Sequence, residues 1–245
     1  MSIFKSLLFW TSSILFAILM FPITVLIWLI SYPFDRERIM VHWWLTFQGV
    51  VLCKSSLLWD IKIEGREKAK RDETYIIISN HQSILDIILI TCLRYRMRWI
   101  SKIEVFKVPV LSWSMKMAKY IPIVRGDNES KELMLDESIK SLRKGISIML
   151  FPEGTRSSDG MIRDFRKGAF QIAISAKLPI LPILVDGTGK VLPKKGIVFS
   201  GGYLLKLKVM DPVYPSDFGT EDPVELAYRF KNKMESTLNI MRKES

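Results

Sequence analysis

The chain has 245 residues, a formal net charge of +11 at pH 7 and a hydrophobic content of 49%. This length accommodates one full domain with an appendage, and the apolar content excludes intrinsic disorder, because disordered chains are poor in apolar residues. The basic charge indicates an anionic partner, either a nucleic acid or an anionic lipid surface, and the hydrophobic content favours the lipid.

The cysteines do not indicate a metal site or a disulfide scaffold. Cys53 and Cys92, the two cysteines of the chain, lie far apart in sequence and match no metal-binding spacing. We therefore expect no bound metal, and a reducing compartment.

The N-terminal segment is apolar enough to enter a membrane. No charged residue occurs from Ser6 to Phe34, and this stretch exceeds the roughly 20 residues that cross a bilayer. It is too long and too aromatic for a cleaved signal peptide. Pro22 lies near its middle and predicts a kink or a break in the helix. A second apolar segment extends over residues 39–59.

These segments allow two membrane arrangements. In the first, a helix over residues 7–30 crosses the bilayer once. In the second, which we favour, both segments form a helical hairpin that dips into one leaflet, because the chemistry predicted below requires shallow access to lipid. The remaining alternative is a pair of buried helices in a soluble protein, and it is disfavoured because uncharged stretches of this length are rare in soluble folds.

Beyond Trp59 the pattern is typical of an α/β domain, with a mixed β-sheet flanked by helices. We place the boundary here, with membrane-anchoring helices in residues 1–59 and the α/β domain in residues 60–245. Apolar runs bounded by glycine, proline or polar residues predict the strands 61–64, 75–79, 98–101, 120–124, 146–151, 180–185, 196–200 and 203–210. The predicted helices are 83–93, with a Ser83–Asp86 capping box, 109–118, 128–144, with Asn128 as its cap, 168–176, and a last helix that begins at Pro223 after an Asp222 cap.

One strand-to-helix turn carries a candidate catalytic pair. His81 follows the strand at 75–79, and Asp86 lies five residues further on. A turn followed by one helical turn can bring the two side chains together, so that the carboxylate holds one ring nitrogen and the other nitrogen faces outward to take a proton. The alternatives are a structural histidine and a helix-start charge. A nucleophilic serine motif is absent, so this pair suits activation of a substrate hydroxyl.

Three basic loops are candidates for binding a phosphate. Residues 151–157 follow a predicted strand and offer a guanidinium, a hydroxyl and backbone amides freed by glycine. Arg125 and Gly126 follow another strand, and residues 166–168 begin a predicted helix. Loops at the ends of strands usually bind ligands in open α/β sheets. A solvated basic surface is the alternative, above all for Arg166.

These stretches resemble the motifs of the glycerolipid acyltransferases, in the same order along the chain. Residues 80–86 resemble the His-x4-Asp signature, residues 121–126 the second motif, residues 151–157 the third and residues 178–182 the fourth. One departure is Lys119, which stands where the second motif often begins with glycine. The resemblance covers roughly residues 59–205 and is closest to the bacterial 1-acyl-sn-glycerol-3-phosphate acyltransferases.

The resemblance implies a reaction and a set of roles. A fatty acyl group would move from a thioester of acyl-carrier protein or coenzyme A to the 2-hydroxyl of lysophosphatidic acid, giving phosphatidic acid without a further cofactor. His81 would be the general base and Asp86 its orienting partner. The residues implied to bind substrate are Arg125, Gly126, Glu153, Gly154, Thr155, Arg156, Lys167, Pro179 and Pro182.

The resemblance also implies a place in the cell. The enzyme would act at the inner cell membrane with its catalytic domain on the cytoplasmic face, and its basic surface would attract anionic phospholipids. A basic face that attracts an acidic carrier protein could contain Arg94, Arg96, Arg98 and Lys102. Three alternatives remain: an acyltransferase for the 1-position of glycerol 3-phosphate or for another lysolipid, a non-catalytic membrane-binding module, and a nucleic-acid binder, for which no motif is found.

Overall fold

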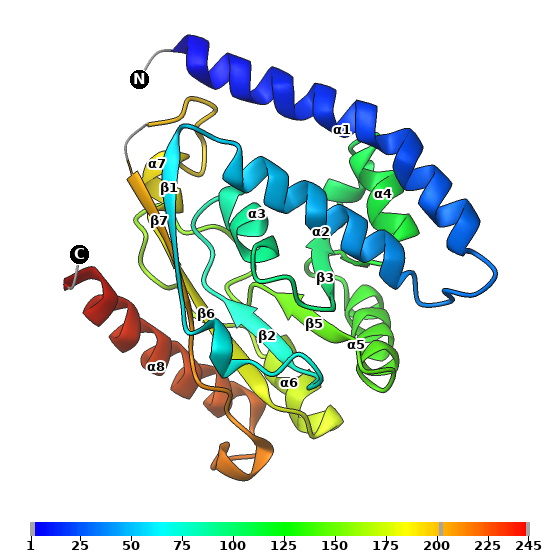
Figure 1. The fold of residues 1–245 in the computed structure, drawn as a ribbon. Helices are drawn as coiled ribbons and strands as arrows, with labels where there is room; N and C mark the ends of the chain where they lie inside the picture. Colours follow the sequence, from blue (N-terminus) through cyan, green and yellow to red (C-terminus); the bar gives the residue numbers. More distant parts are fainter. Residues whose placement is uncertain (1–2, 201–202, 244–245) are drawn as a thin grey trace.

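A computed structural model describes residues 3–200 and 203–243 as a mixed seven-stranded sheet with helices on both faces (Figure 1). The strand order is β1-β7-β6-β2-β5-β3-β4, and neighbouring strands are parallel except for the antiparallel pair β6 and β7. The strands are β1 (Trp59–Glu64), β2 (Ile76–Ser79), β3 (Met97–Lys102), β4 (Ile121–Ile123), β5 (Ser147–Leu150), β6 (Ile180–Asp186) and β7 (Tyr203–Val209). The predicted fold class is confirmed.

The α-helices that surround this sheet are α1 (Ile3–Ser31), α2 (Ile39–Lys54), α3 (Leu85–Thr91), α4 (Leu111–Met117), α5 (Asn128–Leu142), α6 (Gly168–Ala176), α7 (Thr188–Val191) and α8 (Pro223–Lys243). Short 3-10 turns occur at η1 (Arg66–Lys68), η2 (Val105–Lys107) and η3 (Pro215–Asp217). Helices α2, α3 and α7 pack on one face of the sheet, and α5, α6 and α8 pack on the other.

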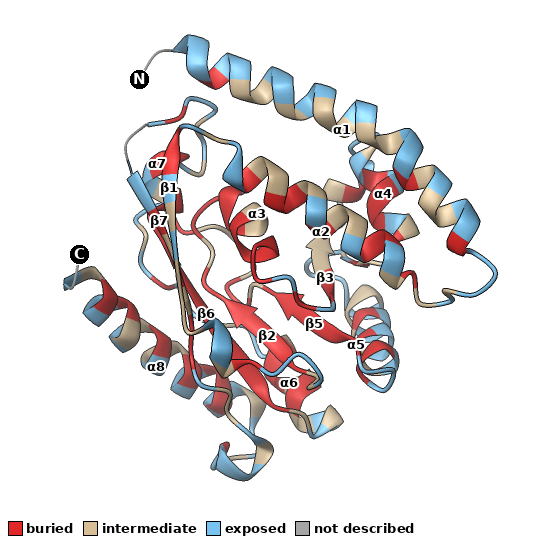
Figure 2. Ribbon diagram, viewed as in Figure 1, coloured by how far each residue is buried: buried red, intermediate tan, exposed pale blue. Residues whose placement is uncertain are grey.

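The central strand β2 shows why the sheet is covered on both faces. Its four residues are all buried, and side chains alternate between the two faces of a strand. Ile77 lies in the core under α3, whereas Ile76 and Ile78 lie in the core under α6 and α8. A continuous apolar run is what a doubly covered parallel sheet requires. Figure 2 shows the resulting band of buried strands.

Two local predictions were wrong. Residues 196–200 form an irregular segment and not a strand, because their polar backbone groups bind other elements. The amide of Phe199 donates to Ser6 Oγ at 2.9 Å, and the amide of Ser200 donates to the carbonyl of Val191 at 2.8 Å. The cap of α5 is Asp127, whose Oδ1 accepts from the amide of Glu129 at 3.0 Å, and not Asn128. Residues 201–202, which separate the predicted strands 196–200 and 203–210, lie outside the described residues.

The capping box at Ser83 is only half formed. Asp86 Oδ2 accepts the amide of Ser83 at 2.9 Å, as a capping box requires. However, Ser83 Oγ donates to the carbonyl of Leu192 at 2.7 Å, and α3 begins two residues later than predicted, at Leu85. The short helix α7 was not predicted at all.

Helices α1 and α2 form a hairpin across one side of the domain (Figure 1). Helix α1 continues through Pro22 without the predicted break, and Figure 1 shows it bending along its length. An apolar helix tolerates proline where neighbouring groups satisfy the freed backbone. Helix α1 is long and apolar enough to cross a membrane by length and composition, and most of its large side chains are exposed (Figure 2).

Helix α1 contacts the rest of the molecule at both of its ends. Near its start, the indole nitrogen of Trp10 donates to the carbonyl of Ile197 at 2.8 Å. In its second half, Thr24 Oγ1 accepts from the indole of Trp44 on α2 at 3.0 Å. Because about 14 residues separate these contacts, the helix lies alongside the molecule for roughly 20 Å.

A partly buried ion network fastens the hairpin loop to the sheet. Glu37, between α1 and α2, pairs with Arg98 on β3 at 2.6 Å and with Lys144 at 2.6 Å. Burial alone would raise the pKa of Glu37, but hydrogen bonds from Lys144 and Arg98 outweigh it and lower the pKa to about 2. Arg98 is buried, which excludes it from the predicted carrier-attracting face. The hairpin is therefore anchored by charge as well as by apolar packing.

Candidate active site

The candidate site lies at one edge of the sheet. Parallel strands β2, β4, β5 and β6 all end there, so the turn after β2, the loop after β5 and the turn after β6 meet. A hydrogen bond of 2.7 Å from the amide of Ser157 to the carbonyl of His81 joins the first two of these segments. Carboxyl ends of parallel strands are the usual location of ligand sites in α/β sheets.

The predicted pair is in contact. His81 Nδ1 lies 2.8 Å from Asp86 Oδ2. Since a carboxylate only accepts hydrogen bonds, the hydrogen of this bond belongs to Nδ1, and a neutral ring then carries its lone pair on Nε2. The side chain of Asp86 is fully buried, whereas that of His81 is 15% exposed. Asp86 therefore holds the His81 ring from its buried side, and the ring stays accessible to solvent on its other side.

Asp86 is held by more than the histidine. Its Oδ2 also accepts the amides of Gln82 at 2.7 Å and Ser83 at 2.9 Å. Its Oδ1 accepts the hydroxyl of Thr188, which lies just after β6 and is itself fully buried. These bonds satisfy a buried carboxylate that would otherwise be costly, and they fix the side chain in one position.

Two neighbouring residues hold His81 in place: Phe151 stacks on its ring, and Asn80 fixes the backbone directly before it. The ring of Phe151 stacks on His81 with centroids 3.9 Å apart and an interplanar angle of 13°. Asn80 bonds the backbone of Val185 twice, its amide donating to the carbonyl and its oxygen accepting from the amide, both at 2.9 Å. This pairing extends the contact between β2 and β6 by one residue beyond the last strand pair, so the turn starts from a rigid base.

Glu153 supports the turn from the loop after β5. Its Oε1 accepts the amide of His81 at 2.7 Å, and its Oε2 accepts the amide of Arg163 at 3.1 Å. The side chain is buried, and burial raises its pKa to about 7 against the opposing effect of these two bonds. Both oxygens are engaged by backbone, so Glu153 holds the loop, and its predicted contact with substrate stays a prediction.

A basic cluster lies beside this loop. Burial and the nearby guanidinium of Arg166 lower the pKa of Arg125. Arg166 also lies over Gly154: a Cβ there would come within 2.8 Å of Arg166 Nε, and Gly154 has a φ of +69° that favours glycine. The neighbouring guanidiniums of Arg125 and Arg166 supply positive charge that suits an anion such as a phosphate. Arg156, on the same loop, is half-buried.

Some predicted residues are not brought to the dyad. Pro179 precedes β6, and its carbonyl accepts the amide of Ile76 at the start of β2, so it lies at the opposite end of the strands from His81. Pro182 is buried within β6 and alternates onto the face that carries Leu184 and α8. Both positions follow from the course of β6. Pro179 lies at the amino end of this strand, away from the carboxyl edge where His81 lies, and Pro182 faces α8.

The substrate-binding roles predicted for three further residues stay predictions. Lys167 precedes α6 and is exposed, Gly126 is exposed with a φ of +87°, and Thr155 is half-buried on the loop after β5.

The residues that sequence reasoning missed are those that support Asp86 from a distance. Gln82 Nε2 donates to Asp186 Oδ1 at 3.2 Å, and Asp186 also pairs with Arg242 of α8 at 2.7 Å. Thr188 and Asp186 lie 102 and 100 residues beyond Asp86 in the sequence. The only available signal was their position directly after a predicted strand.

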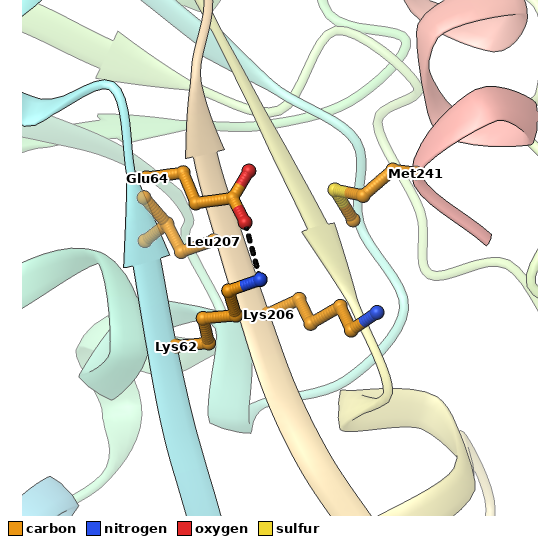
Figure 3. Close-up of a pocket in the computed structure, with 5 residues that line it drawn as sticks. All are labelled: Lys62, Glu64, Lys206, Leu207 and Met241. Atoms are coloured by element: carbon orange, nitrogen blue, oxygen red, sulfur yellow. Dashed lines mark ion pairs between the residues drawn. The ribbon is translucent and has the colours of Figure 1, made fainter. Parts of the chain in front are cut away.

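A separate small hollow between β1, β7 and α8, lined by Lys62, Glu64, Lys206, Leu207 and Met241 (Figure 3), lies on the other face of the sheet from the dyad.

Comparisons with known proteins agree on one family. The acyltransferase family model matches residues 60–186. The chain is 35% identical over 213 residues to a chloroplastic 1-acyl-sn-glycerol-3-phosphate acyltransferase of Brassica napus, which covers 85% of this chain and 59% of that protein. It is 37% identical over 161 residues to a chloroplastic enzyme of the same name from Arabidopsis thaliana, covering 64% of this chain and 45% of that protein. The chain thus spans about half of the length of these curated relatives.

A solved structure is similar over nearly the whole chain. The crystal structure of the 1-acyl-sn-glycerophosphate acyltransferase PlsC from Thermotoga maritima superposes with a TM-score of 0.79 at 26% identity. The match covers 98% of this chain and 95% of that one, so it includes the N-terminal hairpin as well as the sheet.

The raised pKa of Glu153 predicts a pH dependence of stability. Its folded pKa of about 7 exceeds the ordinary glutamate value of 4.5, so the folded state binds the proton more tightly. The contribution to stability is therefore full below pH 4.5 and is lost as the pH rises through 7. Relative to Glu153→Gln, the free energy of unfolding of the wild type should fall over this window by up to about 1.4 kcal/mol per pH unit. Urea unfolding in micelles at a series of pH values measures this, and parallel curves for the two proteins would contradict it.

Proposed function

The chain belongs to the acyltransferase family, and from this premise we propose that it transfers a fatty acyl group from a thioester to the 2-hydroxyl of lysophosphatidic acid, giving phosphatidic acid. The observation that carries the proposal is the His81–Asp86 contact of 2.8 Å beside a basic cluster at one sheet edge. The printed names of the relatives support the choice of acceptor. The thioester donor is acyl-carrier protein or coenzyme A, and no further cofactor takes part.

The geometry supports a general-base mechanism without an acyl-enzyme. His81 Nε2 takes the proton from the acceptor hydroxyl while its oxygen attacks the thioester carbonyl. The tetrahedral intermediate then collapses, the carbon–sulfur bond breaks, and the protonated His81 returns the proton to the leaving thiolate. Asp86 stays hydrogen-bonded to Nδ1 throughout and stabilises the imidazolium that forms between the two steps.

The basic cluster provides the position for the acceptor phosphate. Arg125 and Arg166 lie near one another at the same edge as the dyad, and Arg156 lies on the loop whose next residue, Ser157, bonds the dyad turn. A phosphate between the guanidiniums offsets their mutual repulsion. Holding the phosphate fixes how far the hydroxyl of the same molecule can lie from His81, which is the contribution that orientation makes to catalysis.

The hairpin supports action at a membrane within one leaflet. Helix α1 contacts the domain at Trp10, through the carbonyl of Ile197, and again at Phe21, through the ring of Trp113, so a bilayer-crossing orientation would carry polar parts of the domain into the hydrocarbon. An in-plane helix keeps its apolar side in lipid and its other side on the domain. We assign the catalytic domain to the cytoplasmic face of the inner cell membrane, in keeping with the free, buried thiols of Cys53 and Cys92.

Removal of the base should abolish most turnover. We expect His81→Ala to lower kcat by about 10²–10⁴-fold, as loss of a general base does, and Asp86→Asn to lower it through loss of the carboxylate that holds Nδ1. The assay uses purified protein, lysophosphatidic acid and each thioester donor, and circular dichroism checks that the variants fold. Wild-type turnover by a folded His81→Ala protein would disprove the mechanism.

Thr188 should act through Asp86. Thr188→Val keeps the shape of the side chain but removes one hydrogen bond to a carboxylate, worth about 1.5–3 kcal/mol. We therefore expect kcat to fall by about 10–100-fold with little change in the KM for lysophosphatidic acid, and Thr188→Ser to restore it. Steady-state kinetics of the two variants measures this. Equal losses in both variants would indicate a packing role, and an unchanged kcat in Thr188→Val would exclude the positioning role.

The arginine cluster should distinguish acceptors by their phosphate. Arg125→Ala and Arg166→Ala should each raise the KM for lysophosphatidic acid by about 10-fold or more, because each removes a charge-assisted contact. Turnover of a monoacylglycerol, which lacks the phosphate, should change much less. Arg143→Ala is the matched control, since Arg143 is exposed at the other end of β5. Equal losses on both acceptors would argue against a phosphate site.

A further inference from the structure

An apolar segment that includes the first residues of α4, residues 108–113, is exposed and takes no part in the contacts of the candidate active site. Val108, Leu111 and Trp113 are 49%, 46% and 50% exposed, and Pro109 between them is exposed as well. The opposite side of the same helix is buried, with Met115 packed inside. Helix α4 is therefore amphipathic in its local setting, with one apolar side left facing outward.

The backbone of this segment is held in a strained turn. Val110 has φ 64° and ψ −57°, and the amide of Leu111 donates to the carbonyl of Pro109 at 2.7 Å, which closes a γ-turn. A positive φ is disfavoured for any residue with a branched Cβ. Strain of this kind persists where the surrounding structure enforces it, and it is concentrated at sites with a function. Here it places Val108 and Leu111 at the tip of a projecting turn.

The exposed segment is continuous with the apolar surface of α1. The ring of Trp113 lies 5.4 Å from that of Phe21 on α1. Ile18, three residues before Phe21 and therefore on the same side of α1, is 50% exposed, and Leu19 next to it is 67% exposed. Figure 1 shows α4 beneath the middle of α1, on the side of the hairpin away from β1. One apolar surface therefore extends from the outer side of α1 onto the turn before α4.

Within residues 105–120 all charges are of one sign, and the exposed Glu104 just before this stretch pairs with Lys102 at 2.7 Å. Residues 105–120 contain Lys107, Lys116 and Lys119 and no acidic residue. All three lysines are exposed. A lysine can extend its charged end to lipid headgroups while its stem covers apolar surface, and basic residues beside an apolar segment bind anionic bilayers. Tryptophan is the residue type that prefers the boundary between headgroups and acyl chains.

The segment also lies at the catalytic edge of the sheet. It follows η2, which comes directly after the carboxyl end of β3, and the amide of Ile103 there donates to the carbonyl of Ile123 at the end of β4 at 3.0 Å. Arg125 of the basic cluster is two residues further on. A membrane contact at this position would bring the catalytic edge close to the bilayer.

We propose that residues 108–113 form a second membrane-inserting element, which enters the headgroup and upper acyl region of an anionic bilayer beside α1. This inference rests on the proposed function for the position of the lipid substrate. A single helix in the plane of the bilayer leaves the molecule free to roll about the helix axis. A second contact to one side of α1 stops that rotation and holds the edge that carries His81 and Arg125 toward the lipid.

Site-specific labelling tests this contact without an activity assay. Leu111→Cys, Leu19→Cys and Leu133→Cys are labelled with the same environment-sensitive fluorophore in the full chain, because Cys53 and Cys92 are buried. Leu133 on α5 is the matched control, at 58% exposure away from the hairpin. The labelled proteins are added to vesicles of phosphatidylcholine and phosphatidylglycerol that contain a spin-labelled lipid near the headgroup.

We expect the vesicles to shift the emission at positions 111 and 19 to the blue and to quench it, and to leave position 133 unchanged. Quenching at 19 without quenching at 111 would overturn the second contact while leaving membrane action intact. Absence of quenching at both positions would overturn the membrane placement as well. In either case turnover of lysophosphatidic acid in micelles tests the chemistry separately.

A charge at the same position gives a second measurement. Leu111→Glu should weaken binding of the chain to these vesicles by about 10-fold, because it removes a buried apolar side chain and adds a charge that anionic lipid repels. Leu133→Glu should change binding by less than about twofold. Equal binding of wild type and Leu111→Glu in a vesicle flotation assay would overturn the proposal.

Discussion

The structure of the site depends on one buried carboxylate. Asp86 accepts hydrogen bonds from the ring of His81, from the amides of Gln82 and Ser83, and from the hydroxyl of Thr188. A fully buried carboxylate with fewer partners would destabilise the fold, so the same bonds that stabilise the turn also fix the histidine. The carboxylate of Asp86 holds together the end of β2, the start of α3 and the turn after β6.

The proposed reaction also requires an anion site, which we place at the same edge of the sheet, and a lipid surface, which we place on the hairpin. The loop after β5 carries Glu153, which braces the dyad turn through its backbone, and it also carries the glycine over which Arg166 lies. The hairpin is fastened to β3 through Glu37 and Arg98. The proposed base, the basic cluster and the hairpin are therefore connected through the sheet and its loops, as the proposed reaction on a membrane lipid requires.

Local patterns in the sequence predicted what local chemistry determines. The apolar run before His81, the five-residue spacing to Asp86 and the cap at Asp222 led to the correct strand, contact and helix start. Long-range pairings were not visible. Thr188 and Arg242 reach the site only because β6 lies beside β2 and α8 packs across the sheet. Residues 196–200 have the composition of a strand, but their hydrogen-bonding groups are taken by α1 and α7, which no local pattern reveals.

The most direct test of this account is the position of the proton on His81. The chain has two histidines, so the protein labelled with ¹⁵N-histidine in micelles gives two side-chain patterns, and a His42→Gln variant assigns them. At a pH where the ring is neutral, the account predicts that His81 carries its hydrogen on Nδ1, toward Asp86, and that Nε2 is unprotonated and able to accept a proton. A hydrogen on Nε2 in the neutral ring would contradict it, because that nitrogen could not then act as the base.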